Sequence, residues 1–417
     1  MSQLINQLLS ALDKYPWPTH VNDIGGIPKI RAWTAVLLIA MGTAVAQSFG
    51  RFTYGILLPA IRDDLQISNT IAGSLAAANV AAYLVGTLVV AWASSHLRLL
   101  VVFRLGLAMA TLGLFAIAMA QTPPLLVIGL VLAGLGGAFV WIPAPIIAAD
   151  SLPAEQRALG VALMSSGVGL GLVFSSFLSG HLRSIQGDAA WSAVYEVLGT
   201  IAVIALLGSL LLVKHRQTSP SANAGFGGFS ALSRMRGWRA LIFAYAVFGF
   251  TYLLVLGFLT TRLEDDSLWS SADATFAFTL MSIAMVVGGP ILIGLTKRIG
   301  HRLVLGGAFL SWSILVSVVL FGWMLPTLFA VMGLGILFSG IPTVITLYVV
   351  ENTSSNDYGP CYAAATLAFG VAQVASPQVG GVIADITGSF TPVFVLSAAL
   401  SISGLVAALR LPSHAEY

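Results

Sequence analysis

Long apolar segments separated by short polar breaks run along the whole chain. A helix needs about 20 mostly apolar residues to cross the hydrocarbon core of a bilayer, and it satisfies its own backbone hydrogen bonds there. The pattern therefore predicts an all-α membrane protein with twelve transmembrane helices. We place these spans at residues 33–60, 71–93, 99–120, 125–149, 158–181, 191–213, 239–261, 273–295, 303–323, 326–349, 361–384 and 392–409.

The longest hydrophilic stretch, residues 214–238, lies near the midpoint and is Ser- and Gly-rich between basic ends, as in a flexible linker. The segments on its two sides echo each other at an offset of about 200 residues, which is typical of the repeats of secondary transporters. The echoes pair Phe49-Gly50 with Phe248-Gly249, Thr53-Tyr54 with Thr251-Tyr252, Asp150 with Glu351, and Gly167-Val168 with Gly370-Val371. We expect two pseudo-symmetric six-helix bundles around a central cavity. The expected division is an N-terminal segment 1–31, a bundle 32–213, a linker 214–238, a bundle 239–410 and a tail 411–417.

Composition supports a bilayer as the surrounding solvent, because 58% of the residues are hydrophobic and only 8% are charged. Soluble domains carry about 25% charged residues. The net charge of +3 comes from residues in short loops, so we expect no nucleic-acid partner. The single cysteine, Cys361, excludes an intrachain disulfide and a paired-cysteine metal site, and we expect no metal and no cofactor.

Lys and Arg are unevenly divided between the two sides of the predicted membrane. With the N-terminus inside, fifteen of the nineteen fall on the inner side, three on the outer side, and Arg51 within the first span. The positive-inside rule then predicts a multi-pass inner-membrane protein, expected to be monomeric, with both termini in the cytoplasm. Residues 1–31 carry apolar side chains at helical spacing, which fits either a helix on the membrane surface or a disordered tail.

Arg51 places a permanent charge in the middle of the first span. The aqueous edge at Arg62 lies about 16 Å further along the helix at ~1.5 Å per residue, and a snorkelling arginine reaches only part of that distance. A charge at this depth usually faces a wet cavity; the alternative is an interfacial anchor. No Asp, Glu or His lies in the middle of any span. We therefore expect the counter-charge to come from the substrate, a small organic anion or zwitterion.

Polar residues at helical spacing gather on single faces of several spans. Together with the arginine they form the predicted substrate site, namely Gln47, Arg51, Tyr54, Asn79, Tyr83, Tyr252 and Gln373. The alternative is that these side chains pack one helix against another, as polar and small residues commonly do in membranes.

Asp150 and Glu351 end the fourth and tenth spans on the predicted inner side. A carboxylate at a helix C-terminus opposes the helix dipole, so each is expected to have a cationic partner unless it is simply solvated. The candidates are Arg98 or Arg104 for Asp150, and Arg298 or Arg302 for Glu351.

One loop resembles a signature of the major facilitator superfamily. Residues 294–302 look like the signature G-x-x-x-D-R-x-G-R-R, with Lys297 where an acid is usual. Gly50-Arg51-Phe52-Thr53-Tyr54 followed by Leu58-Pro59 resembles the YbfB/YjiJ-type branch. The resemblance covers span number, loop lengths and repeat. It implies a secondary transporter that works by alternating access, in which the Asp150 and Glu351 pairs latch the inner face while the outer face is open.

Other function classes have less support. No metalloprotease, serine-hydrolase or nucleotide-binding motif can be read, so an enzyme is not expected. A proton-coupled multidrug or metabolite efflux antiporter is the alternative transporter, with a coupling proton as partner beside the small-molecule substrate. However, such drug exporters usually carry an arginine where this chain has Leu130, and a proline that residues 167–171 lack. A transporter-like sensor without turnover also remains open.

Overall fold

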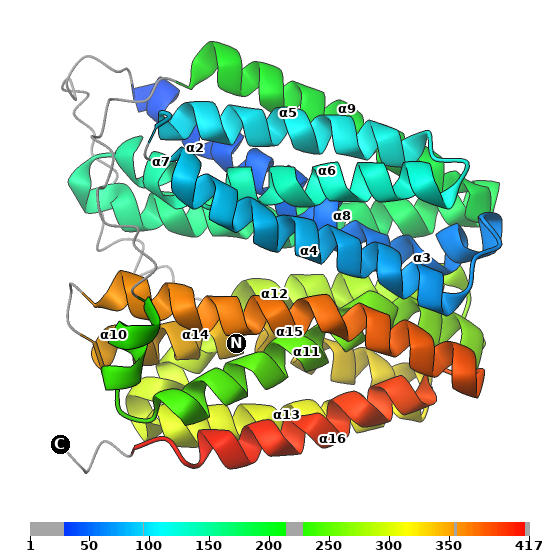
Figure 1. The fold of residues 1–417 in the computed structure, drawn as a ribbon. Helices are drawn as coiled ribbons and strands as arrows, with labels where there is room; N and C mark the ends of the chain where they lie inside the picture. Colours follow the sequence, from blue (N-terminus) through cyan, green and yellow to red (C-terminus); the bar gives the residue numbers. More distant parts are fainter. Residues whose placement is uncertain (1–28, 95, 214–227, 354–356, 413–417) are drawn as a thin grey trace, which may run out of the picture.

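The computed structural model describes residues 29–94, 96–213, 228–353 and 357–412. All regular structure in this part of the chain is helical, and twelve helices are long and apolar enough to cross a membrane (Figure 1). The predicted number of spans is confirmed. Most observed ends lie within a few residues of the predicted ones, and the fifth span runs about five residues beyond its predicted end, to Gln186. The segment 1–31, predicted as either a surface helix or a disordered tail, lies almost entirely outside the described residues.

The first six spans form the N-terminal bundle, drawn from blue to green in Figure 1. Its elements are α2 (Lys29–Thr43), η1 (Ala44–Phe52), α3 (Thr53–Asp64), α4 (Asn69–Ala93), α5 (Leu99–Ala118), α6 (Pro123–Trp141), α7 (Ala144–Asp150), η2 (Ala154–Gln156), α8 (Arg157–Gln186), η3 (Asp188–Ala190) and α9 (Trp191–Leu212).

The last six spans form the C-terminal bundle, drawn from green to red. Its elements are α11 (Trp238–Thr261), η4 (Arg262–Asp266), α12 (Ser271–Ile299), α13 (His301–Leu320), α14 (Met324–Glu351), α15 (Tyr358–Thr387) and α16 (Thr391–Ala408). In the chain, α10 (Gly228–Arg234) lies between the two bundles. It packs against α15 of the C-terminal bundle, with an ion pair of 2.9 Å from Arg234 to Asp357. The second part of the predicted linker is therefore helical and attached to the C-terminal bundle.

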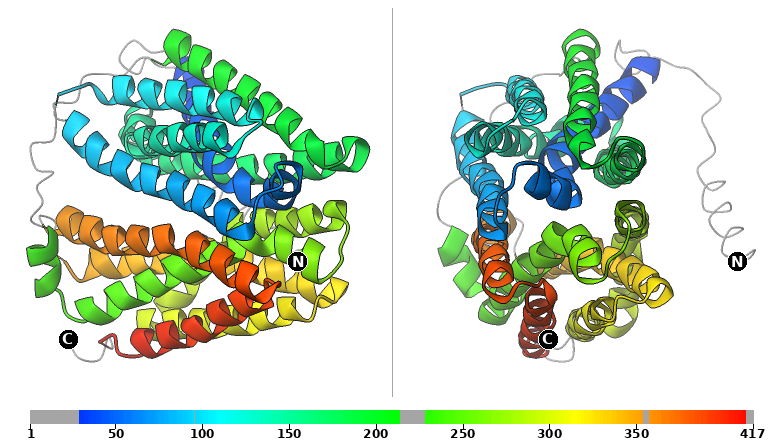
Figure 2. Two further views of the ribbon diagram at one scale, coloured as in Figure 1. Left: turned by 45° about the vertical axis from the view of Figure 1, so that its right-hand side comes forward. Right: turned by 90° about the vertical axis from the view of Figure 1, so that its right-hand side faces the viewer.

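The two ends of the molecule differ. We call the end that carries the linker the linker end, and the opposite end the far end. At the linker end lie the C-terminus of α9, helix α10 and the start of α13. At the far end lie the C-termini of α3, η4 and α15 and the N-termini of α4, α12 and α16 (Figures 1 and 2).

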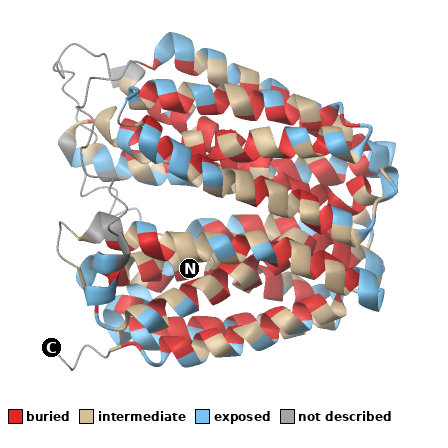
Figure 3. Cartoon of the chain, viewed as in Figure 1, coloured by how far each residue is buried: buried red, intermediate tan, exposed pale blue. Residues whose placement is uncertain are grey.

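Large apolar side chains cover the outside of both bundles, as a bilayer requires. Leu211 and Phe329, for example, are 76% and 72% exposed. Exposed and buried positions alternate along most helices, so that buried residues line the contacts between helices (Figure 3). Because lipid is as apolar as these side chains, close packing and not hydrophobic burial holds the helices together.

The first span changes its hydrogen-bonding pattern midway. Residues Ala44–Phe52 are π-helical, between two α-helical segments. Side-chain hydrogen bonds hold this segment: Thr53 Oγ1 donates to the carbonyl of Ser48 at 2.9 Å, Asn79 Nδ2 donates to the carbonyl of Gly50 at 3.0 Å, and Ser48 Oγ donates to the carbonyl of Val168 at 2.6 Å. Such π segments are rare and occur frequently at functional sites. Arg51 lies within this one.

The bundles contact each other through α4 with α15, α8 with α12, and α3 with α11. Glycines allow the backbones to approach closely at the far end. A Cβ atom on Gly55 would come within 2.7 Å of the Leu256 carbonyl, and one on Gly73 would collide with the Pro377 carbonyl. Thr260 Oγ1 also donates to the carbonyl of Gly55 across the interface at 2.8 Å. The far end of this structure is therefore closed by direct packing.

Candidate functional site

The Arg51 side chain lies between the two bundles. Its Nη2 donates to Gln373 Oε1 of α15, and its Nη1 lies 3.5 Å from Gln47 Oε1, one turn earlier in η1. The guanidinium carbon is 4.5 Å from the ring centroid of Tyr83 on α4, which is a cation–π geometry. Four of the seven predicted site residues thus meet at one point, and the arginine does not face lipid.

Three N–H groups in this cluster have no hydrogen-bond partner in the described part of the chain. They are Arg51 Nε, Gln47 Nε2 and Gln373 Nε2, and all three atoms are buried. Buried polar groups are almost always bonded, so each exception needs a reason. No carboxylate pairs with Arg51 among the described residues. The cluster therefore combines one positive charge with unfilled donors.

Aromatic rings lie around the side of this cluster that faces the C-terminal bundle. Tyr252 of α11 stacks on Phe248 and Phe369, with centroid distances of 5.2 and 5.7 Å. Phe338 of α14 packs edge-on against both Tyr252 and Phe52, at 5.0 and 6.0 Å. Tyr252 is thus part of an aromatic wall that reaches η1 through Phe338.

The remaining two predicted site residues make bonds within the N-terminal bundle. Tyr54 donates to the carbonyl of Ala72 at 3.0 Å, and Asn79 donates to the carbonyls of Gly50 and Leu130 at 3.0 and 2.7 Å. Both side chains also border, with Arg51, a small pocket of about 30 Å³ on the far-end side of the arginine. Their polar groups are occupied, so they shape the pocket and position η1.

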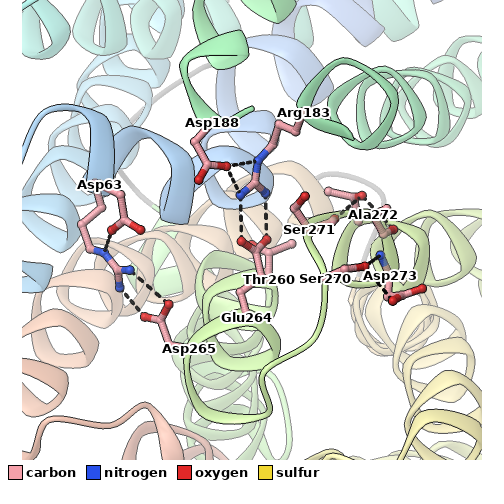
Figure 4. Close-up of polar contacts among 12 residues, drawn as sticks. Asp63, Arg183, Asp188, Thr260, Glu264, Asp265, Ser270, Ser271, Ala272 and Asp273 are labelled. Carbon is pink, nitrogen blue, oxygen red and sulfur yellow. Dashed lines mark hydrogen bonds and ion pairs between the residues drawn. The ribbon is translucent and has the colours of Figure 1, made fainter. Parts of the chain in front are cut away.

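Two ion pairs cross between the bundles at the far end. Arg183 of α8 makes two parallel bonds to Glu264 of η4, at 2.8 and 2.7 Å, and also binds Asp188 (Figure 4). Arg62 of α3 pairs with both oxygens of Asp265. These contacts add to the glycine packing that closes this end.

A third far-end contact is a helix cap supplied by the opposite bundle. Asp385, at the C-terminal part of α15, accepts hydrogen bonds from the backbone N–H groups of Asn69 and Thr70 at 2.9 and 2.7 Å. These are the first two residues of α4, whose N–H groups have no partner within the helix.

Sequence reasoning did not include these far-end residues in the site. Arg62 and Arg183 counted only among the three cations on the outer side, and Glu264, Asp265 and Asp385 were not singled out. One signal was present: the run Arg62-Asp63-Asp64 and the run Glu264-Asp265-Asp266 end equivalent spans at the offset of about 200 residues that marks the repeat.

The expected latch residues lie at the linker end. Arg104 donates to the carbonyls of Ser209 and Val213 at 2.6 and 2.9 Å, where α9 ends, while Asp150 ends α7 and Arg98 precedes α5. A cation at a helix C-terminus satisfies its free carbonyls. The Arg104 contacts seen here are thus within one bundle and to backbone.

Glu351 lies in a second, larger pocket at the linker end. Its carboxylate is 3.4 Å from His301 Nε2, and the pocket of about 510 Å³ that it borders is also lined by Arg298 and Arg302. The structure thus places Glu351 and its two expected partners around one pocket.

Comparison with known proteins identifies the family. The family described as "Uncharacterised MFS-type transporter YbfB" matches residues 39–409. The chain belongs to this family. It is therefore a membrane transporter of the major facilitator type and not an enzyme.

Individual relatives agree with the family. This MFS transporter is 26% identical over 377 residues to "Uncharacterized MFS-type transporter YfhI" of Bacillus subtilis (strain 168), a match that covers 86% of this chain and 90% of the relative.

Solved structures share the fold at low sequence identity. A mutant of the nucleoside transporter NupG superposes with a TM-score of 0.77 at 14% identity, covering 91% of this MFS transporter and 99% of NupG. A bacterial homologue of the human lysosomal transporter Spinster, solved in an inward-facing and unoccupied conformation, gives 0.70 at 14% identity, covering 92% and 96%.

Proposed function

We propose that this MFS transporter moves a small organic anion or zwitterion by alternating access, with Arg51 binding the acid group of the solute. The observation that carries the proposal is the bond from Arg51 to Gln373, which joins the two bundles at mid-span. A solute held there would touch both bundles, so its binding would respond to their relative movement. The unfilled N–H donors around the guanidinium favour an oxygen acceptor such as a carboxylate.

The orientation follows from the distribution of Lys and Arg. The positive-inside rule assigns the linker end to the cytoplasm and the far end to the outside of an inner membrane. With this orientation the far-end ion pairs and glycine contacts close the outer face, which supports assigning the structure to the inward-facing state of the proposed cycle.

The linker end carries the latch in the opposite state. When the inner face closes, Glu351 is bound by Arg298 or Arg302 across the pocket that the three residues now share, and Asp150 by Arg98 or Arg104. In this structure Arg104 binds carbonyls at the end of α9, within its own bundle. The latch contacts and the far-end contacts thus form in opposite states of the proposed cycle.

A thermal-shift screen of small acids, amines and zwitterions on the purified protein tests the substrate class. We expect a subset of acids to raise the melting temperature of the parent and not of Arg51→Ala. Arg239→Ala is the matched control, because it removes an arginine at the start of α11 that lies outside both the site and the latch. Acids should still stabilise this control. Stabilisation by cations alone would contradict the proposal.

Flux of the acid found in this way into proteoliposomes then separates a transporter from a sensor. We expect the parent to accumulate the labelled acid and Arg51→Ala to lose the flux. Binding without flux by the parent would show that the chain senses the solute and does not move it.

A further inference from the structure

The space on the far-end side of Arg51 is too small for the body of a solute. The pocket there has a volume of about 30 Å³, which is room for little more than a water molecule. Beyond it, close packing of Gly55 and Gly73 against the other bundle closes the molecule. A solute whose acid group meets Arg51 must therefore extend from the arginine toward the linker end.

The aromatic wall lies on this linker-end side. Phe369 comes one helical turn before Gln373, the partner of Arg51, and side chains four residues apart share a face of a helix. Since α15 runs from the linker end to the far end, Phe369 is the nearer of the two to the linker end (Figure 1). On α11, which runs the same way, the rings continue from Tyr252 through Phe248 to Tyr245. The body of the solute would thus lie beside aromatic rings.

The rings of the wall are nearly parallel. Phe369 is inclined by 13° to both Phe248 and Tyr252, with centroids 6.1 and 5.7 Å away, and by 21° to Tyr245 at 4.4 Å. Gly249 permits this approach, because a Cβ atom there would come within 2.8 Å of the Phe369 ring. Offset parallel stacking is one of the two arrangements that aromatic pairs prefer, so the wall offers flat faces to which a further ring can be added.

Phe338 brings the wall to the space between the bundles. Its ring packs edge-on against Tyr252 of its own bundle and Phe52 of the other, at 5.0 and 6.0 Å. A ring held between the two bundles in this way faces the interior and not lipid, yet both Phe338 and Phe369 are only partly buried. Part of the wall is therefore uncovered inside the molecule, where a solute can contact it.

We propose that the solute is an aromatic monocarboxylate, whose acid group binds Arg51 and whose ring stacks on the aromatic wall. The inference rests on the proposed function, in which Arg51 binds an acid group, and assigns the rest of the solute. Residues one turn apart on a helix face, such as Phe369 and Gln373, have Cβ atoms about 5–6 Å apart. A two-carbon chain between ring and carboxylate spans such a distance, so 3-phenylpropanoate is the probe.

A zwitterion with a quaternary ammonium group is the rival class, because aromatic faces also bind such cations. Two observations disfavour it. The Arg51 guanidinium carbon already lies 4.5 Å from the Tyr83 centroid and 5.4 Å from that of Phe52, so a second cation on the wall would be repelled by a charge close by. No Asp or Glu lies in the middle of any span to pair with it. A neutral ring avoids the cost of an unpaired buried cation.

Isothermal titration calorimetry of the purified protein with 3-phenylpropanoate and 3-cyclohexylpropanoate tests the proposal. The two acids share the carboxylate and the chain length, and differ in whether the ring is aromatic. We expect the parent to bind the aromatic acid about threefold more tightly or better, because stacked rings interact beyond the area that they bury. Partitioning into detergent favours the saturated acid, which has the larger apolar area, and so cannot produce this preference.

Leucine variants test whether the wall causes the preference. Phe338→Leu removes a ring that faces the interior and keeps an apolar side chain, so the ratio of the two affinities should fall to about one while the saturated acid still binds. Phe369→Leu should give the same result from another helix, which keeps the test available if one variant fails to fold. Phe329→Leu is the matched control: Phe329 is also on α14, but it is 72% exposed on the outside of the bundle, so the preference should remain.

Three results would overturn the proposal. One is equal affinity of the parent for the two acids, which needs no variant to fold. Another is a preference that persists in both Phe338→Leu and Phe369→Leu. The third is tighter binding of 4-(trimethylammonio)butanoate than of 3-phenylpropanoate, which would assign the wall to a cation.

Arg51→Ala distinguishes failure of this proposal from failure of the proposed function. If both acids bind equally well and only when Arg51 is present, the aromatic body is rejected and acid recognition stands. If 3-phenylpropanoate is preferred but binds equally well to Arg51→Ala, the proposed role of Arg51 is rejected and the wall alone binds the ring. Absence of binding by either acid to the parent would reject both.

Discussion

Arg51 and Gln373, separated by 322 positions in the chain, are joined by a hydrogen bond between η1 of one bundle and α15 of the other. The bond connects the charge in the middle of the first span to the opposite half of the protein. It also leaves Gln373 Nε2 and Arg51 Nε without partners in the described structure. A solute acid can use both groups without breaking the bond that positions them.

A carboxylate at position 373 should compete with the solute for Arg51. In Gln373→Glu the new side chain can form an ion pair with the guanidinium, so stabilisation by acids in the thermal-shift assay should fall at least about tenfold in apparent affinity. Gln378→Glu is the matched control, since Gln378 lies on the same helix and accepts a bond from Ser74 of the other bundle. Unchanged acid binding by Gln373→Glu would contradict the role given to Arg51.

Gly73 should be required for closure of the far end. A Cβ atom there collides with the backbone carbonyl of Pro377 in the opposite bundle. Overpacking of this kind costs about 1–3 kcal/mol, so Gly73→Ala should lower flux about tenfold or more while acid binding persists in the open state. Gly307→Ala controls for the added methyl group, because a Cβ atom on Gly307 would have no heavy atom of another part of the chain within 4 Å. Equal flux in the two variants would show that Gly73 is not an inter-bundle contact.

Asn79 should stabilise the protein by holding the π-helical segment. Its carboxamide donates to the carbonyls of Gly50 and Leu130 in a buried position. Asn79→Ala leaves both acceptors short of a donor, at a cost of about 1–3 kcal/mol, and should lower the midpoint of thermal unfolding in detergent at a fixed scan rate. In Asn352→Ala, which loses a bond at the end of α14, the midpoint should change much less. A midpoint for Asn79→Ala equal to that of the control would reject this role.

The latch at the linker end should affect rate more than binding. Glu351→Gln and Arg302→Ala remove one charge each from the pocket that they share. A charge contact at a helix end contributes about 0.3–1 kcal/mol, so losing it should slow proteoliposome flux several-fold in both variants. The shift in melting temperature that acids produce should stay the same. If both variants transport at the parent rate, Glu351 is simply a solvated acid at a helix end.

The seven residues of the predicted substrate site show how much of the site the sequence alone can predict. Depth in the membrane and helical phase were enough to single out Arg51 and Gln47, because both depend on neighbours within one or two turns. The same phase argument selected Asn79 and Tyr54, yet their polar groups bond within their own bundle. Periodicity shows which face of a helix is polar, but not whether that face meets a cavity or another helix.

The far-end ion pairs could not be predicted from the local sequence. Glu264 and Arg183 lie at span ends, where acids and bases are common and usually solvated, so no local pattern distinguishes them. Their importance comes from burial, which depends on how α8 and η4 approach each other across the interface.

The amino-acid sequence by itself determined that this protein crosses a bilayer twelve times as two similar halves, and that Arg51 lies deep within the first span. These properties are local, because lipid requires about 20 apolar residues for every crossing whatever the neighbouring helices are. Only the tertiary structure decided which charges meet. Gln373 reaches Arg51, and Glu264 reaches Arg183, because two bundles that are far apart in the chain pack against each other, and the low dielectric of that contact makes each pairing energetically important.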